Sequence, residues 1–237
     1  MKLHQLTRLC TALSIVVLGG YDITSAARAE ESVVPGIDVS HFQGAIDWEQ
    51  VGGQKIRFVY VKASEGLHTA DARLQENWRG ARQQGLKTGP YHFFHPDEDP
   101  IAQAEHFLSQ LKSANIDLAG SLPPVLDIEV AEGTKSTTLR RDIKQWLHHV
   151  EKNTGCKPIL YTSPHFWEKE DAGDFAAHHL WLADYAKTPT VPKGWRHWTF
   201  WQHSEDGTIA GIEKKVDLTV FAGDDIKLEE LTCKARP

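Results

Sequence analysis

The sequence has little sulfur, no excess of positive charge and no obvious linker. Its 237 residues include one methionine and three cysteines, and its formal net charge is -6. A negatively charged chain lacks the broad attraction to phosphate backbones and anionic lipids, so we expect no nucleic-acid partner. No stretch is rich enough in glycine, serine or proline to act as a linker, and no internal repeat is visible. With 41% hydrophobic and 24% charged residues, the composition favours one folded domain, which we expect to be a monomer.

The N-terminal segment differs from the rest of the chain and has the features of a secretory signal peptide. A positively charged start precedes an apolar run at residues 9–18, and residues 27–29, Ala-Arg-Ala, offer a small-x-small cleavage site, with residues 25–27 as an alternative. The apolar run is well short of the about 20 residues that a transmembrane helix needs, so we expect no stable membrane anchor. We therefore expect removal of residues 1–29 on export. The mature domain, residues 30–237, would then lie in the periplasm or the medium.

Two cysteines remain after this cleavage. Cys10 belongs to the predicted signal peptide and lies at the start of its apolar run rather than after it, which argues against lipoprotein processing. Cys156 and Cys233 stay in the mature chain, and their spacing suggests no zinc site. An isolated pair in an oxidising compartment is more often a disulfide than two free thiols. Spacing alone does not show that they approach each other, so the disulfide is a hypothesis.

Short β-branched or aromatic runs alternate with longer amphipathic runs through most of the chain. Strands are predicted at residues 34–39, 58–63, 88–94, 125–129 and 159–162. Helices are predicted at residues 72–84, 101–113 and 138–153, the first and last of them followed by a glycine. Such alternation predicts βαβ units and a parallel sheet.

The last third of the chain follows a different pattern. Residues 180–185, 199–203 and 216–220 are strand-like, but no clear amphipathic helix separates them. About eight strands therefore emerge, five of them followed by helical or helix-like segments and three not. This pattern predicts an α/β fold, a single TIM-like barrel with a degenerate second half. An open doubly wound sheet is the alternative.

Carboxylates stand at the ends of the predicted strands, where a parallel barrel carries its chemistry. Asp127 and Glu129 are two residues apart on one strand, so both point to the same face, and their proximity pushes their pKa values apart. An isolated Asp-x-Glu is more often a solvated strand end. Here Asp38 ends the first strand and Asp217 lies in the last, and these strands are neighbours in a closed barrel. We therefore expect all four acids around one mouth.

Other polar and aromatic side chains occupy predicted strand ends near these acids. They are Lys62, Tyr91, His92, Tyr161, Trp181, Tyr185 and Gln202. Acids for the chemistry together with aromatic rings for stacking are typical of a carbohydrate cleft. Tryptophans are expected in the core at Trp48, Trp78 and Trp146, and near the cleft at Trp181, Trp195, Trp198 and Trp201.

An ordered series of motifs runs along the mature chain. It includes Gly36-Ile37-Asp38-Val39-Ser40, Val61-Lys62-Ala63-Ser64-Glu65-Gly66, Gly89-Pro90-Tyr91-His92-Phe93-Phe94, Val125-Leu126-Asp127-Ile128-Glu129, Trp181-Leu182-Ala183-Asp184-Tyr185, Trp201-Gln202 and Val216-Asp217-Leu218. On these residues the sequence resembles the lysozymes of glycoside hydrolase family 25, which are N-acetylmuramidases. The resemblance implies a (β/α)5(β)3 barrel. It also implies hydrolysis of the β-1,4 bond between N-acetylmuramic acid and N-acetylglucosamine in peptidoglycan glycan strands.

The resemblance further implies a role for each acid. Glu129 would be the general acid, and Asp127, ionised beside it, would orient the 2-acetamido group in a retaining, substrate-assisted reaction. A covalent role for Asp127 is the competing mechanism. Asp38 and Asp217 would hold this pair and tune its protonation. The implied substrate-binding residues are Lys62, Glu65, Tyr91, His92, Phe93, Tyr161, Trp181, Tyr185 and Gln202.

Two other functions are compatible with parts of the pattern. A chitinase-like hydrolase also uses paired acids on a barrel strand, but its longer acidic motif is absent before Asp127. A glycan-binding protein on an inactive barrel would be expected to lack one of the acids, and all are present. The histidines show no His-Glu-x-x-His or facial-triad spacing, so we expect no metal and no other cofactor.

Overall fold

The computed structural model describes residues 32–173 and 175–235, and the predicted signal peptide lies outside these described residues. The strands are β1 (Val33–Val39), β2 (Phe58–Glu65), β3 (Thr69–Ala70), β4 (Lys87–Phe93), β5 (Val125–Asp127), β6 (Ile159–Thr162), β7 (Leu180–Ala183), β8 (Phe200–Gly207) and β9 (Val216–Ala222). The helices are η1 (His41–Gln43), α1 (Trp48–Gly52), α2 (Leu74–Gln83), α3 (Pro100–Ser113), α4 (Ser136–Thr154), α5 (Pro164–Lys169) and α6 (Asp225–Glu230).

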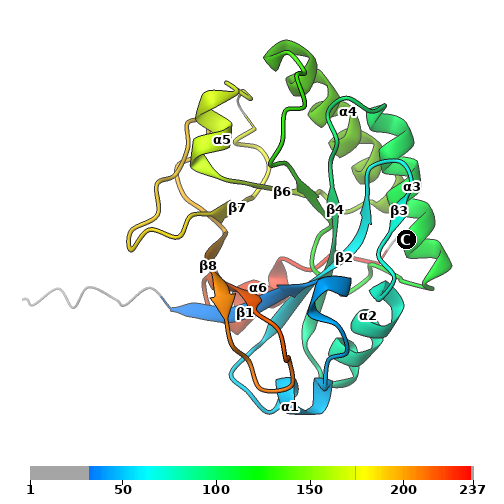
Figure 1. The fold of residues 1–237 in the computed structure, drawn as a ribbon, viewed down its shortest axis with the longest axis vertical. Helices are drawn as coiled ribbons and strands as arrows, with labels where there is room; N and C mark the ends of the chain where they lie inside the picture. The colour runs from blue at the N-terminus through cyan, green and yellow to red at the C-terminus, as the bar shows by residue number, and fades with distance from the viewer. Residues whose placement is uncertain (1–31, 174, 236–237) are drawn as a thin grey trace, which may run out of the picture. The chain divides into compact units, whose positions relative to one another are not determined.

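Strand β1 closes the sheet into a barrel because it pairs along both of its edges. It is parallel to β2 and antiparallel to β9, and the remaining strands complete the ring in the order β8, β7, β6, β5 and β4. The two-residue strand β3 pairs only with the end of β2. Figure 1 shows the strands arranged as a ring with α2, α3 and α4 outside one side of it. The closed ring confirms the predicted TIM-like barrel and excludes the open doubly wound sheet.

The helices divide the barrel into two unequal parts. Helices α1 to α5 follow β1, β2, β4, β5 and β6 in turn, whereas β7, β8 and β9 follow one another with no helix between them. Strand β9 is antiparallel to both of its neighbours, β8 and β1. This order of elements is the (β/α)5(β)3 arrangement that the resemblance implied.

Alternation along the strands separates two hydrophobic clusters. Phe58 and Tyr60 of β2 pack inside the barrel with Phe200 of β8, whereas Val59 and Val61 of β2 belong to the cluster that includes the helices. Successive side chains of a strand point to opposite faces, so β1, β2, β5, β6 and β9 each contribute to both clusters. The same alternation decides which side chains at a strand end reach the barrel mouth.

Close packing in the barrel interior requires a glycine on β4. A Cβ atom at Gly89 would lie 2.3 Å from the ring of Tyr60, far inside van der Waals contact. The ring of Tyr60 in turn packs on Trp181, with centroids 4.6 Å apart. These aromatic side chains fill the interior and form the layer beneath the mouth.

The three long helices lie where the amphipathic pattern predicts them. Helix α4 ends at a left-handed Gly155 with φ of 70°, as expected for a glycine just past the last turn. Helix α3 starts with Pro100, and the side chain of its N-cap Asp99 accepts a hydrogen bond from the Ala102 N–H. The short helices α1, α5 and α6 have only five or six residues, too few to show an amphipathic period.

A disulfide joins Cys156 and Cys233, whose Cα atoms are 5.3 Å apart. It closes a 77-residue span, for which loss of chain entropy in the unfolded state gives an upper estimate of about 4 kcal/mol of stabilisation. Backbone hydrogen bonds from Cys233 to Ser121 and from Gly120 to Cys233 hold the C-terminal segment alongside this bond. The hypothesised disulfide is therefore confirmed. Across residues 32–173 and 175–235, none of the helices combines the length and apolar character needed to cross a membrane.

Candidate active site

The strand ends surround a cavity of about 280 Å³ at the mouth of the barrel. Its lining comes from every strand of the ring, which explains why residues far apart in sequence meet here. The lining residues are Asp38, Val39, Ser40, Phe42, Gln43, Lys62, Tyr91, Phe93, Asp127, Glu129, Tyr161, Trp181, Tyr185, Gln202, Glu205 and Asp217. All four acids singled out from the sequence are among them.

Asp127 and Glu129 form the first acid pair. Strand β5 ends at Asp127, which is 6% exposed, and Glu129 follows two residues later in the connection to α4. Their carboxyl groups are close enough to titrate as a coupled pair. Burial raises the pKa of Asp127 well above its usual value, and the negative charge of Glu129 adds to this shift. Burial also raises the pKa of Glu129.

Asp38 and Asp217 form the second pair, at the seam where the barrel closes. They are directly opposite each other in the antiparallel ladder between β1 and β9, as expected for the first and last strands. Burial raises the pKa of Asp38 well above its usual value, followed in importance by the charge of Asp217. Burial raises the pKa of Asp217 to about 6, and the charges of Glu205 and Glu129 act in the same direction. The two pairs therefore titrate as one electrostatically coupled group.

The family roles need a proton on Glu129 and a charge on Asp127. Burial is the largest cause that raises the pKa of each acid, and Asp127 is the more buried of the two. Two carboxyl groups this close titrate as a pair, and one shared proton relieves the repulsion between them.

The side-chain amide of Gln202 connects the second acid pair to two tyrosines. Its Nε2 donates to Oδ2 of Asp38 at 3.0 Å, and its Oε1 accepts hydrogen bonds from the hydroxyls of Tyr161 and Tyr185, both at 2.9 Å. Burial and the nearby carboxylates raise the pKa of Tyr161 well above its usual value. Both hydroxyls thus keep their protons and fix the amide orientation that makes Gln202 a donor to Asp38.

Lys62 brings a positive charge into this acidic cavity. Its Nζ donates to Oε2 of Glu65 at 2.6 Å and lies 5.2 Å from the centroid of the Phe93 ring. Lys62 lowers the pKa of both Asp127 and Glu129, against the larger effect of burial. Glu65 is not among the residues lining the cavity, and it contacts the site through Lys62.

His92 does not belong to the cavity, contrary to the expectation that it binds substrate. It is fully buried on the helix side of the barrel, where Ser64 Oγ and Nδ1 are 2.8 Å apart and Nε2 lies 3.2 Å from Gln103 Oε1. Its ring stacks on Trp146, and burial lowers its pKa to about 3. Alternation on β4 is the physical reason: Tyr91 and Phe93 point inward, so the residue between them points outward.

The tryptophans are only partly where the sequence predicted. Trp48 and Trp146 are buried, Trp78 packs against the same core, and Trp181 lines the cavity floor. Trp195 and Trp198 precede β8, so they lie at the opposite end of the barrel from the mouth. Trp195 there donates to the His178 carbonyl oxygen. Trp201 faces outward and donates to the Asp184 carbonyl oxygen at 2.6 Å. Trp195, Trp198 and Trp201 therefore lie outside the cavity, contrary to the prediction that they line the cleft.

Several lining residues were not assigned to the site from the sequence. Phe42, on η1, is 63% exposed at the cavity rim, and Ser40 and Gln43 cap the same short helix. Glu205 lines the cavity because β8 continues four residues beyond its predicted end. An aromatic residue four positions after the strand-end acid Asp38 was the available signal for Phe42. A second hollow of about 860 Å³ adjoins the first and shares Glu129, Tyr161, Tyr185 and Glu205 with it.

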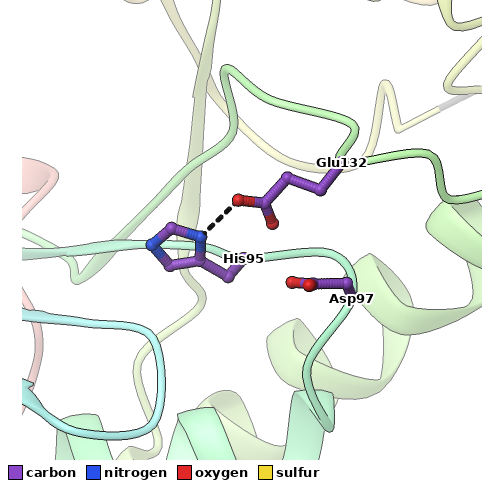
Figure 2. Close-up of side chains that lie close together, drawn as sticks. All are labelled: His95, Asp97 and Glu132. Atoms are coloured by element: carbon purple, nitrogen blue, oxygen red, sulfur yellow. Dashed lines mark hydrogen bonds and ion pairs between the residues drawn. The ribbon is translucent and has the colours of Figure 1, made fainter.

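One cluster in the described part of the chain has side chains close enough to hold a metal ion. His95, Asp97 and Glu132 each offer a ligand atom, and these atoms lie within 4.8 Å of one another. Figure 2 shows Glu132, from the loop before α4, directing its carboxylate at the imidazole, with Asp97 on the loop of His95. Nδ1 of His95 is 2.7 Å from Glu132 Oε1, and Nε2 is 3.2 Å from Glu65 Oε1. Contacts from both nitrogens to carboxylates favour an imidazolium, so we assign the cluster as an ion-pair network.

Comparisons with known proteins show the family of this chain. Residues 37–212 match the family described as Glycosyl hydrolases family 25. This chain belongs to that family. It is 36% identical over 83% of its length to the uncharacterised protein YegX of Escherichia coli O157:H7, covering 72% of that protein. It is 34% identical over 88% of its length to Lysozyme M1 of Streptomyces globisporus, covering 74% of that protein.

A solved structure supports the same assignment. The bacterial lysozyme of Streptomyces coelicolor superposes with a TM-score of 0.78 at 34% identity, over 85% of this chain and 97% of the lysozyme. The predicted membership of family 25, the barrel fold and the assignment as a glycoside hydrolase of the lysozyme type are thus confirmed. Asp38, Asp127 and Glu129 lie within the matched residues, whereas Asp217 lies five residues beyond their end, at 212. The place of Asp217 in the site therefore rests on its pairing with Asp38.

Proposed function

We propose that this family 25 hydrolase is a retaining muramidase that cleaves the β-1,4 bond between N-acetylmuramic acid and N-acetylglucosamine. The observation that carries the proposal is the convergence of Asp127 and Glu129, backed by a second acid pair, on one cavity lined by aromatic side chains. The match to proteins named lysozyme supports peptidoglycan as the substrate.

The first step breaks the glycosidic bond. Glu129 gives its proton to the bridging oxygen as the bond from that oxygen to C1 of the muramic acid breaks. The carbonyl oxygen of the 2-acetamido group forms a new bond to C1, so the leaving sugar departs with the proton and a cyclic oxazolinium ion remains. The carboxylate of Asp127 accepts a hydrogen bond from the N–H of the acetamido group. Its negative charge balances the positive charge that develops on the oxazolinium ring.

The second step adds water and restores the enzyme. Glu129, now ionised, takes a proton from a water molecule while the water oxygen bonds to C1. The bond from C1 to the acetamido oxygen breaks, and the acetamido group is regenerated. Two displacements at C1 give retention of configuration, and Glu129 ends the cycle protonated. In the competing mechanism, Asp127 itself bonds to C1.

Substrate binding favours the protonation state that the reaction needs. Burial raises the pKa of both acids, so the pair retains a proton more readily than two exposed acids do. An acetamido N–H pointing at Asp127 stabilises the ionised carboxylate, because a hydrogen bond to the charged form favours that form. The proton of the pair then resides on Glu129. The acid is thus prepared when a sugar with a 2-acetamido group is bound.

The shape of the site supports cleavage within a chain of sugars. Glu129 lines both the mouth cavity and the adjoining hollow of about 860 Å³, so the scissile bond would lie at their junction. Phe42 offers an exposed ring at the rim, suited to stacking on a sugar face. We propose that one side of the glycan enters the mouth cavity and the other side runs along the hollow.

We also propose that the protein acts after export. The predicted signal peptide supports this, and so does the disulfide between Cys156 and Cys233, since disulfides persist in oxidising compartments. Release of the protein into the periplasm and release into the medium are both compatible with these features.

Digestion of purified peptidoglycan tests the proposed function. We expect every new reducing end to be N-acetylmuramic acid, and NMR of the first product to show the β-anomer. Glu129→Gln should release no ends above background, and Glu213→Gln, at an exposed position outside the cavity, should match the wild type. New N-acetylglucosamine ends, or preferential cleavage of chitin, would instead indicate a chitinase-like enzyme. Binding of peptidoglycan without any release would indicate a glycan-binding protein.

A further inference from the structure

Lys62 has an unusual position among the residues at the barrel mouth. It is the one lysine or arginine among the described residues that line the cavity, whose other charged lining residues are the acids Asp38, Asp127, Glu129, Glu205 and Asp217. Its charge acts on both members of the catalytic pair. A lysine side chain has a flexible four-carbon stem, so a stable effect on the acids requires an anchor for its ammonium group.

A chain of ion pairs provides this anchor and leads from the cavity to the protein surface. Glu65 bonds to Lys62 Nζ through Oε2 and to His95 Nε2 through Oε1, and His95 Nδ1 contacts Glu132. Lys62 is the buried end, with 8% of its side chain exposed, and the other three members are partly exposed, at 33% for Glu65, 26% for His95 and 30% for Glu132. Each link occupies one carboxylate oxygen or one ring nitrogen, so the orientation of each group depends on the next.

The backbone around His95 is held firmly enough to serve as the fixed end. The buried side chain of Gln103 accepts from the His95 N–H at 3.0 Å and donates to the His95 carbonyl oxygen at 2.7 Å. The hydroxyl of Thr134 donates to the Pro96 carbonyl oxygen at 3.1 Å, which ties the loop of Glu132 to the loop of His95. The imidazole is therefore located by contacts that do not involve the catalytic acids.

We propose that His95 is a positioning residue, which holds the Lys62 ammonium beside Asp127 and Glu129 by way of Glu65. This inference rests on the proposed muramidase function and adds a residue that touches neither the substrate nor the reacting atoms. The carboxylates accept from both ring nitrogens, so the imidazolium is the form that completes both links. The pKa of His95 is raised, because the hydrogen bonds to Glu132 and Glu65 outweigh the opposite effect of partial burial.

The charged groups around His95 come from three segments of the chain. Lys62 and Glu65 belong to β2, Asp97 and Glu98 follow His95 on its own loop, and Glu132 lies on the loop before α4. The buried His92 lies behind it on β4. Removing His95 frees Glu65 and loosens Lys62, so less positive charge acts on Asp127 and Glu129. The pKa values of both acids should then rise.

The test compares pH profiles of kcat and KM on peptidoglycan for the wild type, His95→Ala, His95→Arg and the milder Glu132→Gln. His106→Ala is the matched control, since His106 on α3 contacts the Thr69 carbonyl oxygen and does not line the cavity. We expect His95→Ala to move both limbs to higher pH by roughly half a unit, with kcat at the wild-type optimum reduced about threefold and KM little changed. Glu132→Gln should give a smaller shift of the same sign. Arginine donates to both carboxylates, so His95→Arg should restore the profile.

Other results would overturn the proposal. Superimposable profiles for His95→Ala and the wild type would show that the chain of ion pairs does not reach the acids. A lower rate with unmoved limbs, not restored by arginine, would show a structural role only. A wild-type profile changed by dialysis against EDTA would assign the cluster to a metal ion instead. Absence of any hydrolysis by the wild type would overturn the proposed function itself, a result distinct from these.

Discussion

The two acid pairs at the barrel mouth are built in different ways. Asp127 and Glu129 are close in sequence and owe their proximity to the end of a single strand. Asp38 and Asp217 come from the first and last strands and meet because the barrel closes between β1 and β9. In the proposed mechanism the local pair carries the chemistry, and the long-range pair alters its charge balance. The comparison separates what a short motif can encode from what requires the whole fold.

The largest effect is expected for the local pair, at Glu129→Gln. Glutamine keeps the size of the side chain but has no proton to transfer, so turnover should fall by at least about 100-fold with the fold intact. Rates of reducing-end release together with circular dichroism measure this change, with Glu213→Gln as the control. Comparable turnover by a folded Glu129→Gln enzyme would remove Glu129 from its assigned role.

Asp127→Asn should come next, with a loss of about 100-fold or somewhat less. The amide cannot balance the charge that develops on the acetamido group, although it preserves the packing around this buried position. Mass spectrometry of the wild type during turnover provides the second measurement. We expect no sugar ester on Asp127, and capture of one would establish the covalent mechanism in place of the substrate-assisted one.

For the long-range pair, Asp38→Asn and Asp217→Asn should each reduce the rate by roughly tenfold. Removing a negative charge lowers the pKa of neighbouring acids, so the basic limb, where Glu129 loses its proton, should move to lower pH. This direction is opposite to the one expected for His95→Ala. Asp225→Asn, an exposed acid on α6 that pairs with Arg57, is the control and should change neither quantity. If both variants match the wild type in rate and profile, the seam acids are not part of the site.

The smallest effect concerns stability. The pKa of Asp217 is raised to about 6 in the folded protein by burial, from 3.8 when unfolded, so the unfolded state loses its proton first as pH rises. Asp217 therefore makes its full contribution to the free energy of unfolding below about pH 4, and that contribution is lost as pH rises through about 6. Allowing for its partial solvation, the loss is roughly 1–2 kcal/mol. Asp217→Asn should therefore gain stability relative to the wild type between pH 4 and pH 7, measured by urea denaturation. If the free energy of unfolding depends on pH equally in the wild type and in Asp217→Asn, the pKa of Asp217 is not raised in the folded protein.

Much of the fold and the acidic site could be predicted from the sequence because their signals are local. Strand periodicity and the glycine after α4 located the elements, and Asp38, Asp127 and Glu129 stand at or near strand ends. The neighbouring positions of Asp38 and Asp217 required one further assumption, that the sheet closes. The structure satisfies that assumption through the register of β1 against β9.

The errors and omissions in the predicted site have specific physical causes. His92 was assigned to the cleft with Tyr91 and Phe93, although alternate residues of one strand point to opposite faces. Trp195 and Trp198 were assigned by residue type, and their place before β8 puts them at the far end of the barrel. The contact of His95 with Glu132 joins two loops, and no periodic pattern describes such a contact. Side-chain direction and loop geometry therefore limited the prediction more than the fold did.

A ¹³C NMR titration of the side-chain carboxyl groups, in the wild type and in Asp217→Asn, tests most directly whether the two pairs act as one unit. Signals are assigned with the single variants of Glu129, Asp127 and Asp38. Burial and coupling predict that Glu129 titrates above its usual value of 4.5 in the wild type and that its pKa falls when Asp217 becomes asparagine. A Glu129 that titrates at its usual value and does not respond to the loss of Asp217 would contradict this account.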